Sequence, residues 1–444
     1  MEIAPRRQFL KTLGGVSASL LILPAGTRAQ GKSPNDKLNI GLIGTWGRGE
    51  AHFGTLQKEN VVALCDVNAN HLAGAAKLFP GAKLYADWRK MLEQKDLEAV
   101  MICSADHTHA HISLWAMARG MHVYCEKPLA NSVEEARMVR ASYLEKRQKL
   151  ATQVGTQRHA LENFRRLREW IQDGIVGDVE SACAWGNRKL GRPGYPAAAG
   201  SPPDHLNFDL WLGPSPAHPY SPEYFSGSSG MNCLQWNMYW DFGSGQVGDM
   251  GSHTMDLVWN ALDLRLPQSV EAKGDAFNPD VTPVMLEADW EFPVNGQEKP
   301  VKISWYQGGA MPRSPKGHVD LSQIGHGAMF RGKKGTVICD FDSRMFLPSG
   351  RESDMTHYRA RAKEQLIPSI PDFQGEWILA CKGQGKTSCD FEYGGNLIET
   401  MLLGLVAYRA GKKLSYDGER MTTGDSAADA FLRRSYREGW PLLG

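Results

Sequence analysis

Residues 38–49 read Leu38-Asn39-Ile40-Gly41-Leu42-Ile43-Gly44-Thr45-Trp46-Gly47-Arg48-Gly49, and this stretch decides the fold of the first part of the chain. Its first half is an apolar run typical of a buried strand, and an amphipathic run from Glu50 to Lys58 follows the glycines. A glycine-rich turn between a strand and a helix lets backbone N–H groups meet a pyrophosphate at the positive end of the helix. The stretch therefore predicts the start of a nucleotide-binding fold, although Trp46 stands in place of the middle glycine.

An aspartate near the end of the next apolar run supports this prediction. The run Val61–Val67 predicts a second strand, and Asp66 lies 22 residues after Gly44. A carboxylate at that place accepts hydrogen bonds from both hydroxyls of an adenosine ribose. No arginine follows it directly to receive a 2′-phosphate. The whole pattern predicts a site for NAD, with NADP less expected, whereas the turn alone would also fit an ordinary tight turn.

Short apolar runs and amphipathic stretches alternate up to about Leu150. Such alternation, with nearly continuous apolar strands, predicts a doubly wound parallel sheet with helices on both faces. We therefore expect a nucleotide-binding domain over residues 38–153. Further strands are expected at Ala99–Ser104 and His122–Cys125, and helices at Asn70–Leu78, Trp88–Gln94, His109–Arg119 and Val133–Arg147.

The pattern changes after Gln153. A stretch rich in proline, glycine and aromatic residues runs from about 191 to 245, and runs typical of successive strands with turns between them come later. An α+β domain with a mostly antiparallel sheet is therefore expected over residues 154–444. Its strands are predicted at Ser269–Lys273, Leu286–Phe292, Val301–Tyr306 and Thr336–Asp340, and its helices at Glu162–Asp173, Phe373–Gly383 and Asn396–Ala410.

The first thirty residues have the pattern of an export signal. Arg6-Arg7-Gln8-Phe9-Leu10-Lys11 precedes an apolar run, residues 13–23, that is too short to span a bilayer, and small residues follow at 27–29. The paired arginines predict the twin-arginine pathway, which carries folded proteins; an ordinary basic signal peptide is the alternative. We expect a leader over residues 1–30 that meets the export machinery, a linker over 31–37, a periplasmic or otherwise exported protein, and no stable membrane span.

Composition excludes several classes of protein. With 444 residues, of which 42% are hydrophobic and 22% charged, the chain is expected to build two globular domains. A formal net charge of +1 offers no basic field for nucleic acid. The eight cysteines include no Cys-x-x-Cys pair, so we expect small buried side chains rather than disulfides or metal ligands.

Two motifs follow the third and fourth predicted strands. The first, Asp106-His107-Thr108-His109-Ala110-His111, begins a helix, where alternate residues diverge, so we expect a histidine facing the nucleotide rather than a metal site. The second is Glu126-Lys127-Pro128. Ligands of a doubly wound sheet bind beyond the carboxyl ends of its strands, which makes Lys127 a candidate for the pocket. A solvated surface pair of Glu126 and Lys127 is the alternative.

A third motif opens a helix in the second half of the chain. Asp249, His253 and Asp256 are separated by four and three residues, so we expect all three on one helical face. A carboxylate there can share a substrate hydroxyl with the imidazole, or orient the imidazole. An N-capping aspartate followed by a buried core histidine is the alternative.

Together these motifs resemble the glucose–fructose oxidoreductase / inositol dehydrogenase (Gfo/Idh/MocA) family, in its exported bacterial members. The resemblance runs in order from about Leu38 to the C-terminus. Besides the glycine turn and Asp66, it rests on Asp106-His107-Thr108-His109, Glu126-Lys127-Pro128, Gly155-Thr156-Gln157-Arg158, Trp211-Leu212-Gly213-Pro214 and Asp249-x-x-x-His253. Cys103-Ser104-Ala105 and Trp236-Asn237 depart from the family, which often has Thr-Pro and Trp-Arg there.

The resemblance implies a Rossmann domain and a C-terminal domain whose open sheet mediates homo-oligomers. It implies NAD as cofactor, no metal, and a carbohydrate or polyol substrate between the domains. It places the catalytic role on Lys127, Asp249 and His253. It places the cofactor contacts at Gly44, Thr45, Trp46, Gly47, Arg48, Gly49, Asp66, Ser104, His107, His109, Glu126, Lys127 and Gln157.

The predicted function is an oxidoreductase that acts on a hydroxyl of a sugar, polyol or glycoside by hydride transfer, with a tightly bound cofactor. Lys127 would be the base, because a cationic nicotinamide and burial would both lower its pKa. An NAD-dependent glycosidase that oxidises, eliminates and re-reduces is one alternative. A sugar-binding protein without catalysis is another.

Overall fold

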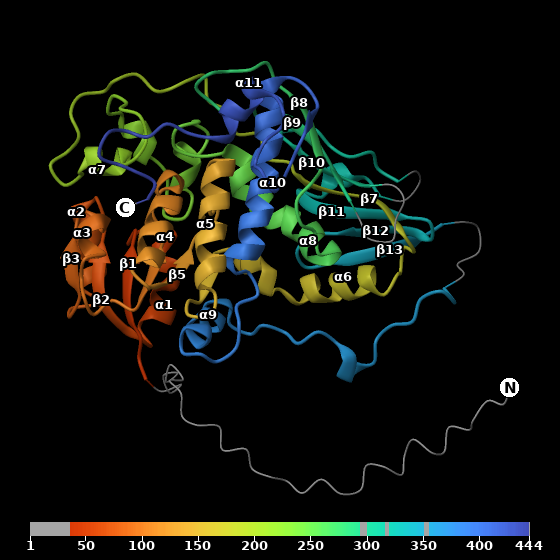
Figure 1. The fold of residues 1–444 in the computed structure, drawn as a ribbon, viewed down its shortest axis with the longest axis horizontal. Coiled ribbons are helices and arrows are strands. Elements are labelled where there is room, and N and C mark those ends of the chain that lie inside the picture. The colour runs from red at the N-terminus through yellow and green to blue at the C-terminus, as the bar shows by residue number, and fades with distance from the viewer. Residues whose placement is uncertain (1–35, 294–299, 316–318, 350–354, 444) are drawn as a thin grey trace, which may run out of the picture.

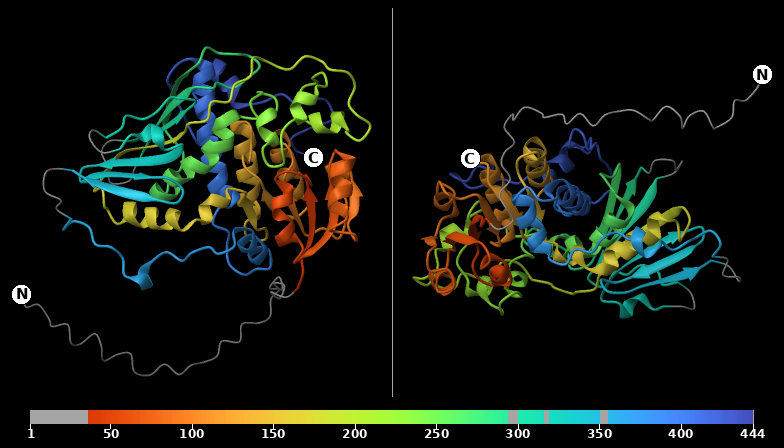
Figure 2. Two further views of the ribbon diagram at one scale, coloured as in Figure 1. Left: turned by 180° about the vertical axis from the view of Figure 1, so that it is seen from behind. Right: turned by 90° about the horizontal axis from the view of Figure 1, so that it is seen from below.

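Figure 1 shows the computed structural model of the chain, which describes residues 36–293, 300–315, 319–349 and 355–443. The predicted leader and nearly all of the predicted linker lie outside the described residues. Two β-sheets lie side by side, and helices α5 (Val133–Lys146) and α10 (Phe391–Ala410) pack against each other between them (Figures 1 and 2). No helix within the described residues has both the length and the hydrophobicity needed to cross a membrane.

The first sheet has six parallel strands in the order β3-β2-β1-β4-β5-β6. This is the strand order of a Rossmann fold, so the predicted doubly wound sheet is confirmed. Its strands are β1 (Asn39–Ile43), β2 (Asn60–Cys65), β3 (Lys83–Tyr85), β4 (Ala99–Ile102), β5 (His122–Cys125) and β6 (Thr152–Val154). Its helices are α2 (Ala69–Ala76), α3 (Trp88–Met91), α4 (His109–Ala118) and α5. The helix predicted from Glu50 is a 3-10 turn, η1 (Gly49–His52), followed by the short α1 (Phe53–Leu56).

Alternate residues of the strands pack on opposite faces of this sheet. In β4, Val100 and Ile102 join the cluster built with α4 and α5, whereas Ala99 and Met101 join the other face. That other face is covered in part by the fully buried Trp377 of α9 (Phe373–Cys381). The helix predicted at Phe373–Gly383 is therefore present, but its packing in the core of the first sheet was not predicted.

The second sheet has eight strands in the order β13-β12-β11-β7-β10-β9-β8-β14. All neighbouring pairs are antiparallel except β7 and β10, which agrees with the predicted mostly antiparallel sheet. The strands are β7 (Val179–Gly186), β8 (Ser269–Gly274), β9 (Leu286–Phe292), β10 (Val301–Gln307), β11 (His326–Gly332), β12 (Gly335–Cys339), β13 (Arg344–Pro348) and β14 (Leu414–Ser415). Strands β7, β11, β13 and β14 are not among the predicted strands; β11 contains two glycines, and β14 has only two residues.

Three long helices cover one face of the second sheet: α6 (Glu162–Gln172), α8 (Ser252–Leu262) and α10. In β9 the buried side chains of Leu286, Ala288 and Trp290 alternate with half-exposed charged residues, as expected for a strand with one covered face. The stretch 191–245 contains the short α7 (Phe208–Leu212) and an aromatic cluster around Phe242. Helix α11 (Ser426–Asp429) lies near the end of the chain.

Candidate active site

The carboxyl ends of β1, β2, β4 and β5 border a cavity of about 560 Å³, whose other wall comes from the second half of the chain. The cavity brings together most of the predicted site. It is lined by Gly44, Trp46, Arg48, Asp66, Ser104, His109, Glu126, Lys127, Gln157, Asp249 and His253. The predicted contacts Thr45, Gly47, Gly49 and His107 do not line it.

The glycines of the first turn are required by close backbone packing. Gly44 has φ +84°, and a Cβ there would lie 2.4 Å from the carbonyl oxygen of Cys103. A Cβ on Gly49 would lie 2.1 Å from the carbonyl oxygen of Gly44. Any side chain at either position would therefore displace the turn. Gly49 serves this turn rather than the cavity itself.

Asp66 is held in place at the end of β2. Its Oδ2 accepts hydrogen bonds from the backbone N–H of Thr45 at 2.8 Å and from its hydroxyl at 3.0 Å. Its Oδ1 accepts the N–H of Asn68 at 2.9 Å. Thr45 thus orients the carboxylate, where the sequence analysis expected a cofactor contact. Trp46 stacks on His71, with ring centres 4.6 Å apart, so the indole lies on the Asp66 side of the turn.

Glu126 is a buried residue of the cavity wall, and its carboxyl group is ionised. Both Nε of Arg48 and Nε2 of His52 lie 2.8 Å from its Oε1. Burial favours the protonated acid, but the bond from His52 and the charge of Arg48 outweigh it and lower the pKa of Glu126 to about 2. A Cβ on Gly155 would lie 2.6 Å from the Glu126 Cδ, so this glycine makes room for the carboxylate. His52 was not identified from the sequence.

Lys127 and Asp249 form an ion pair in the wall of the cavity. The part of the cavity around this pair, with His253 and Arg188, is called its inner end below. Asp249 lies on a π-helical turn, η6 (Val247–Gly251), and its Oδ1 accepts from the Lys127 ammonium. Its other oxygen, Oδ2, lies 2.9 Å from Nη1 of Arg188. Burial raises the pKa of Asp249, but Lys127 and Arg188 outweigh burial and hold this pKa below its ordinary value.

The pKa of Lys127 moves in the direction opposite to the sequence expectation. Burial alone would lower it, but the adjacent carboxylate of Asp249 outweighs burial and raises the pKa of Lys127 above its ordinary value. The expected lowering rested on the cationic cofactor and on burial, without the charge of Asp249. In the structure Lys127 is therefore an ammonium at neutral pH.

His253 lies beside this pair as a neutral imidazole. Its Nδ1 lies 3.2 Å from the hydroxyl oxygen of Thr156. Burial and the nearby charges of Lys127 and Arg158 hold the pKa of His253 well below its ordinary value. A neutral imidazole can both donate and accept, which suits a contact with a substrate hydroxyl.

Asp256 does not line the cavity with Asp249 and His253. His253 and Asp256 both lie in α8 and both contact the segment 156–160, where His253 meets Thr156. Asp256 instead accepts from Nδ1 of His159 at 2.9 Å and from the hydroxyl of Tyr393. It is fully buried and outside the cavity.

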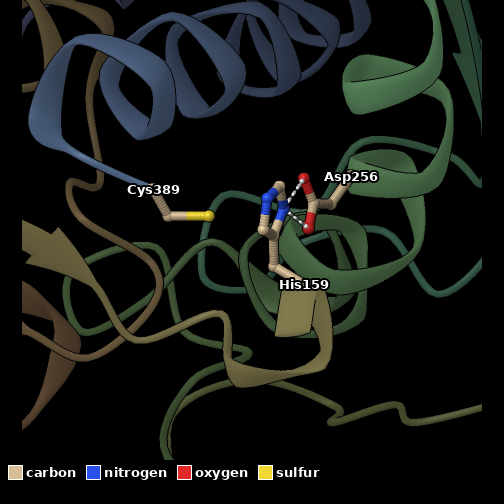
Figure 3. Close-up of side chains that lie close together, drawn as sticks. All are labelled: His159, Asp256 and Cys389. Atoms are coloured by element: carbon tan, nitrogen blue, oxygen red, sulfur yellow. Dashed lines mark hydrogen bonds and ion pairs between the residues drawn. The ribbon is translucent and has the colours of Figure 1, made fainter. Parts of the chain in front are cut away.

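Figure 3 shows this buried group, in which the Sγ of Cys389 faces the ring of His159. One possible ligand atom each from His159, Asp256 and Cys389 lies within 4.8 Å of the others, the kind of grouping that can hold a metal. Both oxygens of Asp256 already accept hydrogen bonds, from His159 and Tyr393. We therefore assign the group to the core, where it ties α8 and α10 to the turn η3 (Gln157–Ala160).

Replacing Asp256 with alanine is expected to lower the free energy of unfolding by about 3 kcal/mol, because His159 and Tyr393 lose their acceptor in a buried place. Urea unfolding of the variant and of wild type measures the difference. The exposed Asp204 provides the matched control, and its alanine variant should unfold like wild type. A loss below 1 kcal/mol for Asp256→Ala would show that the group contributes little to stability.

Of the three alternating histidines, His109 alone lines the cavity. Its Nδ1 lies 2.7 Å from the carbonyl oxygen of Pro128 and its Nε2 lies 2.9 Å from that of Ser104. His107 instead donates to the carbonyl of Trp211 at 2.7 Å, and burial lowers its pKa to about 3. The prediction that His107 contacts the cofactor is therefore not supported, because its ring packs within the aromatic cluster.

Several side chains of the cavity were not identified from the sequence as site residues. Arg188 comes just after the end of β7, a position that could have signalled it, and Arg158 follows Gln157 in the quoted motif. Asn237 is buried, and its Oδ1 has no hydrogen-bond partner within the described part of the chain. An unpartnered buried oxygen in a cavity wall is positioned to meet a ligand.

Two segments from the second half of the chain border the nucleotide side of the cavity. The carbonyl of His205 accepts the N–H of Ala69 at 2.8 Å, and the carbonyl of Val67 accepts the N–H of Asn207 at 2.9 Å. A Cβ on Gly47 would lie 2.9 Å from Oδ1 of Asn232. The loop after β2 and the glycine turn are therefore both in contact with the second half of the chain.

Comparisons with known proteins agree with this architecture. A family model described as "Oxidoreductase family, NAD-binding Rossmann fold" matches residues 38–156, and one described as "Oxidoreductase family, C-terminal alpha/beta domain" matches residues 182–292. The chain is 36% identical to an inositol 2-dehydrogenase of Klebsiella pneumoniae over 161 residues, which are 35% of this chain and 47% of that protein. The chain thus matches about half the length of the inositol dehydrogenases.

Longer similarities are weaker in sequence. A levoglucosan dehydrogenase of Pseudarthrobacter phenanthrenivorans is 23% identical, over 78% of this chain and 85% of that protein. A solved levoglucosan dehydrogenase with NADH and levoglucosan has TM-score 0.57 at 17% identity, over 86% of this chain and 99% of that one. The WlbA dehydrogenase from Bordetella pertussis, solved with NADH and UDP-GlcNAcA, has TM-score 0.60 at 15% identity, over 86% and 99%. These structures share the fold, and with the two family models they show that the chain belongs to the Gfo/Idh/MocA oxidoreductase family.

Proposed function

We propose that this protein is an NAD-dependent oxidoreductase that acts on a hydroxyl of a sugar or polyol by hydride transfer. The proposal rests on one observation: the nucleotide-binding features around Gly44 and Asp66 share a single cavity with the group of Lys127, Asp249 and His253. Relatives named inositol 2-dehydrogenase and levoglucosan dehydrogenase support the substrate class.

The residues present fit NAD. The turn at Gly44 leaves its backbone free of side-chain atoms, and Asp66 keeps acceptor capacity beyond its bonds to Thr45 and Asn68. Arg48 lines the cavity beside the turn and adds a positive charge where a pyrophosphate would lie. When bound, NAD supplies the hydride acceptor or donor.

Lys127, Asp249 and His253 carry out and support the transfer of the hydroxyl proton. In the direction of reduction, the Lys127 ammonium donates a proton to the carbonyl oxygen of the substrate; in oxidation, its amine accepts the proton of the hydroxyl. Asp249 holds Nζ of Lys127 in place and is itself fixed by Arg188. His253 is placed to hold a neighbouring hydroxyl.

The pH dependence follows from the ion pair. Oxidation needs the amine of Lys127, whose pKa is raised, so the oxidation rate should rise about tenfold per pH unit while the pH is below that pKa. Asp249→Asn removes the charge that raises the pKa, whereas burial and Arg188 remain. The rise should then occur at lower pH, and the rate of reduction should begin to fall at lower pH. Profiles of kcat against pH in both directions measure this, and an Asp249→Asn profile that coincides with wild type would contradict it.

A panel of sugars, polyols and glycosides tests the activity itself. NADH absorbance and released sugar are followed together on the purified protein. Reduction of the bound NAD by a sugar or polyol in a single turnover, seen as NADH absorbance and without cleavage of the sugar, is the expected result. Release of sugar without net NADH would indicate a hydrolase instead and overturn the proposal.

We also propose that the chain is exported by the twin-arginine pathway with NAD already bound, and that NAD is regenerated within the site. The paired Arg6 and Arg7 support the route, and the contacts of His205, Asn207 and Asn232 described above support slow release of the cofactor. Replacing both arginines with lysine should leave the protein in the cytoplasm; unchanged export would contradict this route.

Finally, we propose a homo-oligomer formed through the open face of the second sheet, which sedimentation can test.

A further inference from the structure

The inner end of the cavity carries more positive than negative charge. Lys127, Arg158 and Arg188 line it, and Asp249 pairs with both Lys127 and Arg188. One carboxylate is therefore shared by two cations, and Arg158 adds a third. A bound oxidised nicotinamide would add one more positive charge to the same end.

The other carboxyl groups of the wall do not offset this excess. Glu126 is already occupied by Arg48 and His52. Asp106 is buried, and burial together with the charge of Asp249 outweighs the effect of Lys127 and holds the pKa of Asp106 well above its ordinary value. The carboxylates whose charges act on Arg158 are the exposed Asp342, which lies outside the cavity, and Asp249, which is already paired with Lys127 and Arg188.

Arg158 has its hydrogen-bonding groups available. Among the described residues, no carboxylate oxygen lies within 4.0 Å of its guanidinium, and its side chain makes no hydrogen bond to the protein. Its Cζ lies 4.1 Å from the ring centre of Phe341, which supports the flat face of the guanidinium and leaves the N–H groups at its edge free. The cavity also contains the unpartnered Oδ1 of the buried Asn237, an acceptor that a sugar hydroxyl would satisfy.

We propose that the substrate is an acidic sugar, and that Arg158, with Arg188 near it, binds the acidic group. A guanidinium presents two parallel N–H groups that match the oxygens of a carboxylate or phosphate, and the bound anion would neutralise the excess charge. Asn237 would meanwhile hold a hydroxyl. The inference rests on the proposed sugar oxidoreductase function and narrows its substrate class.

Calorimetric titration of the full NADH-loaded protein tests the proposal. The probes are D-glucuronate for a carboxylate, D-glucose 6-phosphate for a phosphate, and D-glucose as the neutral reference. We expect at least one acid to bind about tenfold or more tightly than glucose, and the stronger acid identifies the group. Arg158→Gln should weaken binding of that acid by about tenfold or more and leave glucose within about twofold, because a hydrogen bond to a charged group is lost.

The matched control is Arg119→Gln. Arg119 also lies over an aromatic ring, that of Trp115 at 5.1 Å, but it is exposed and outside the cavity. Its variant should bind the acid like wild type. Arg158→Lys keeps the charge without the paired N–H groups, so its affinity for the acid should lie between those of wild type and Arg158→Gln. If thermal melting shows that Arg158→Gln does not fold, Arg158→Lys is measured in its place.

Two results would overturn the inference: neither acid binds more tightly than glucose, or the Arg158 variants weaken acid and neutral sugar equally. NADH binding, measured in the same experiment, reports separately on the proposed function. Loss of acid selectivity in Arg158→Gln with NADH binding intact supports the inference. Normal NADH binding without any selectivity for the acid would contradict this inference but would not contradict the proposed oxidoreductase function.

Discussion

Lys127→Ala is expected to lower kcat for the sugar substrate by about 100-fold or more, which is the contribution of a positioned acid or base. In the proposed mechanism Nζ of Lys127 carries the proton, and among the described residues no other lysine lines the cavity. Affinity for NAD should change little, because the lysine lies away from Asp66 and the glycine turn. Steady-state kinetics and a separate NADH titration measure the two quantities.

The control for this variant is Lys189→Ala. Lys189 is an exposed lysine one residue after Arg188, and it does not line the cavity. Its variant should retain kcat within about twofold. Near-normal turnover of Lys127→Ala would remove Lys127 from the proposed mechanism, whereas equal losses in both variants would indicate damage to the protein rather than to proton transfer.

Asp66→Ala is expected to weaken NAD binding by about tenfold to 100-fold, because a charged acceptor for the ribose hydroxyls is lost. Binding of NADP should weaken less, since the carboxylate that repels a 2′-phosphate is also removed. The ratio of the affinity for NAD to the affinity for NADP should therefore decrease. Calorimetry on cofactor-stripped protein with each nucleotide measures both affinities.

Asp66 also accepts hydrogen bonds from Thr45 and Asn68, so a control must separate local disorder from loss of charge. Asp66→Asn keeps an oxygen that can accept these bonds but removes the charge. It should lose the discrimination against NADP while keeping more of the affinity for NAD than Asp66→Ala. If wild-type protein binds NADP more tightly than NAD, the assigned role of Asp66 is wrong.

The parts of the site that lie on short segments could be predicted from the sequence. The strand that ends at Ile43, the turn at Gly44 and the position of Asp66 follow from local periodicity and glycine placement. Lys127 could be placed at the ligand-binding edge because parallel strands all end there. Each of these inferences needs information only from neighbouring residues.

The features that could not be predicted depend on contacts between residues far apart in the sequence. Trp377 covers the first sheet from far along the chain, and no local pattern indicates its partner. The role of Asp256 in the core depends on its contacts with His159 and Tyr393, which lie 97 and 137 residues away in the sequence. Similarly, the raised pKa of Lys127 depends on its pairing with Asp249, 122 residues away, which the sequence analysis did not anticipate.

The number of NAD molecules bound per chain tests whether this cavity is a nucleotide site. Purified protein is denatured, and the supernatant is assayed for NAD and NADP, both as purified and after incubation with excess NAD followed by removal of free nucleotide. We expect close to one NAD per chain after incubation. If the cofactor is retained during export, the same amount should be found in the protein as purified. Protein that holds neither nucleotide under either condition would contradict the claim that this cavity is the site of an NAD-dependent oxidoreductase.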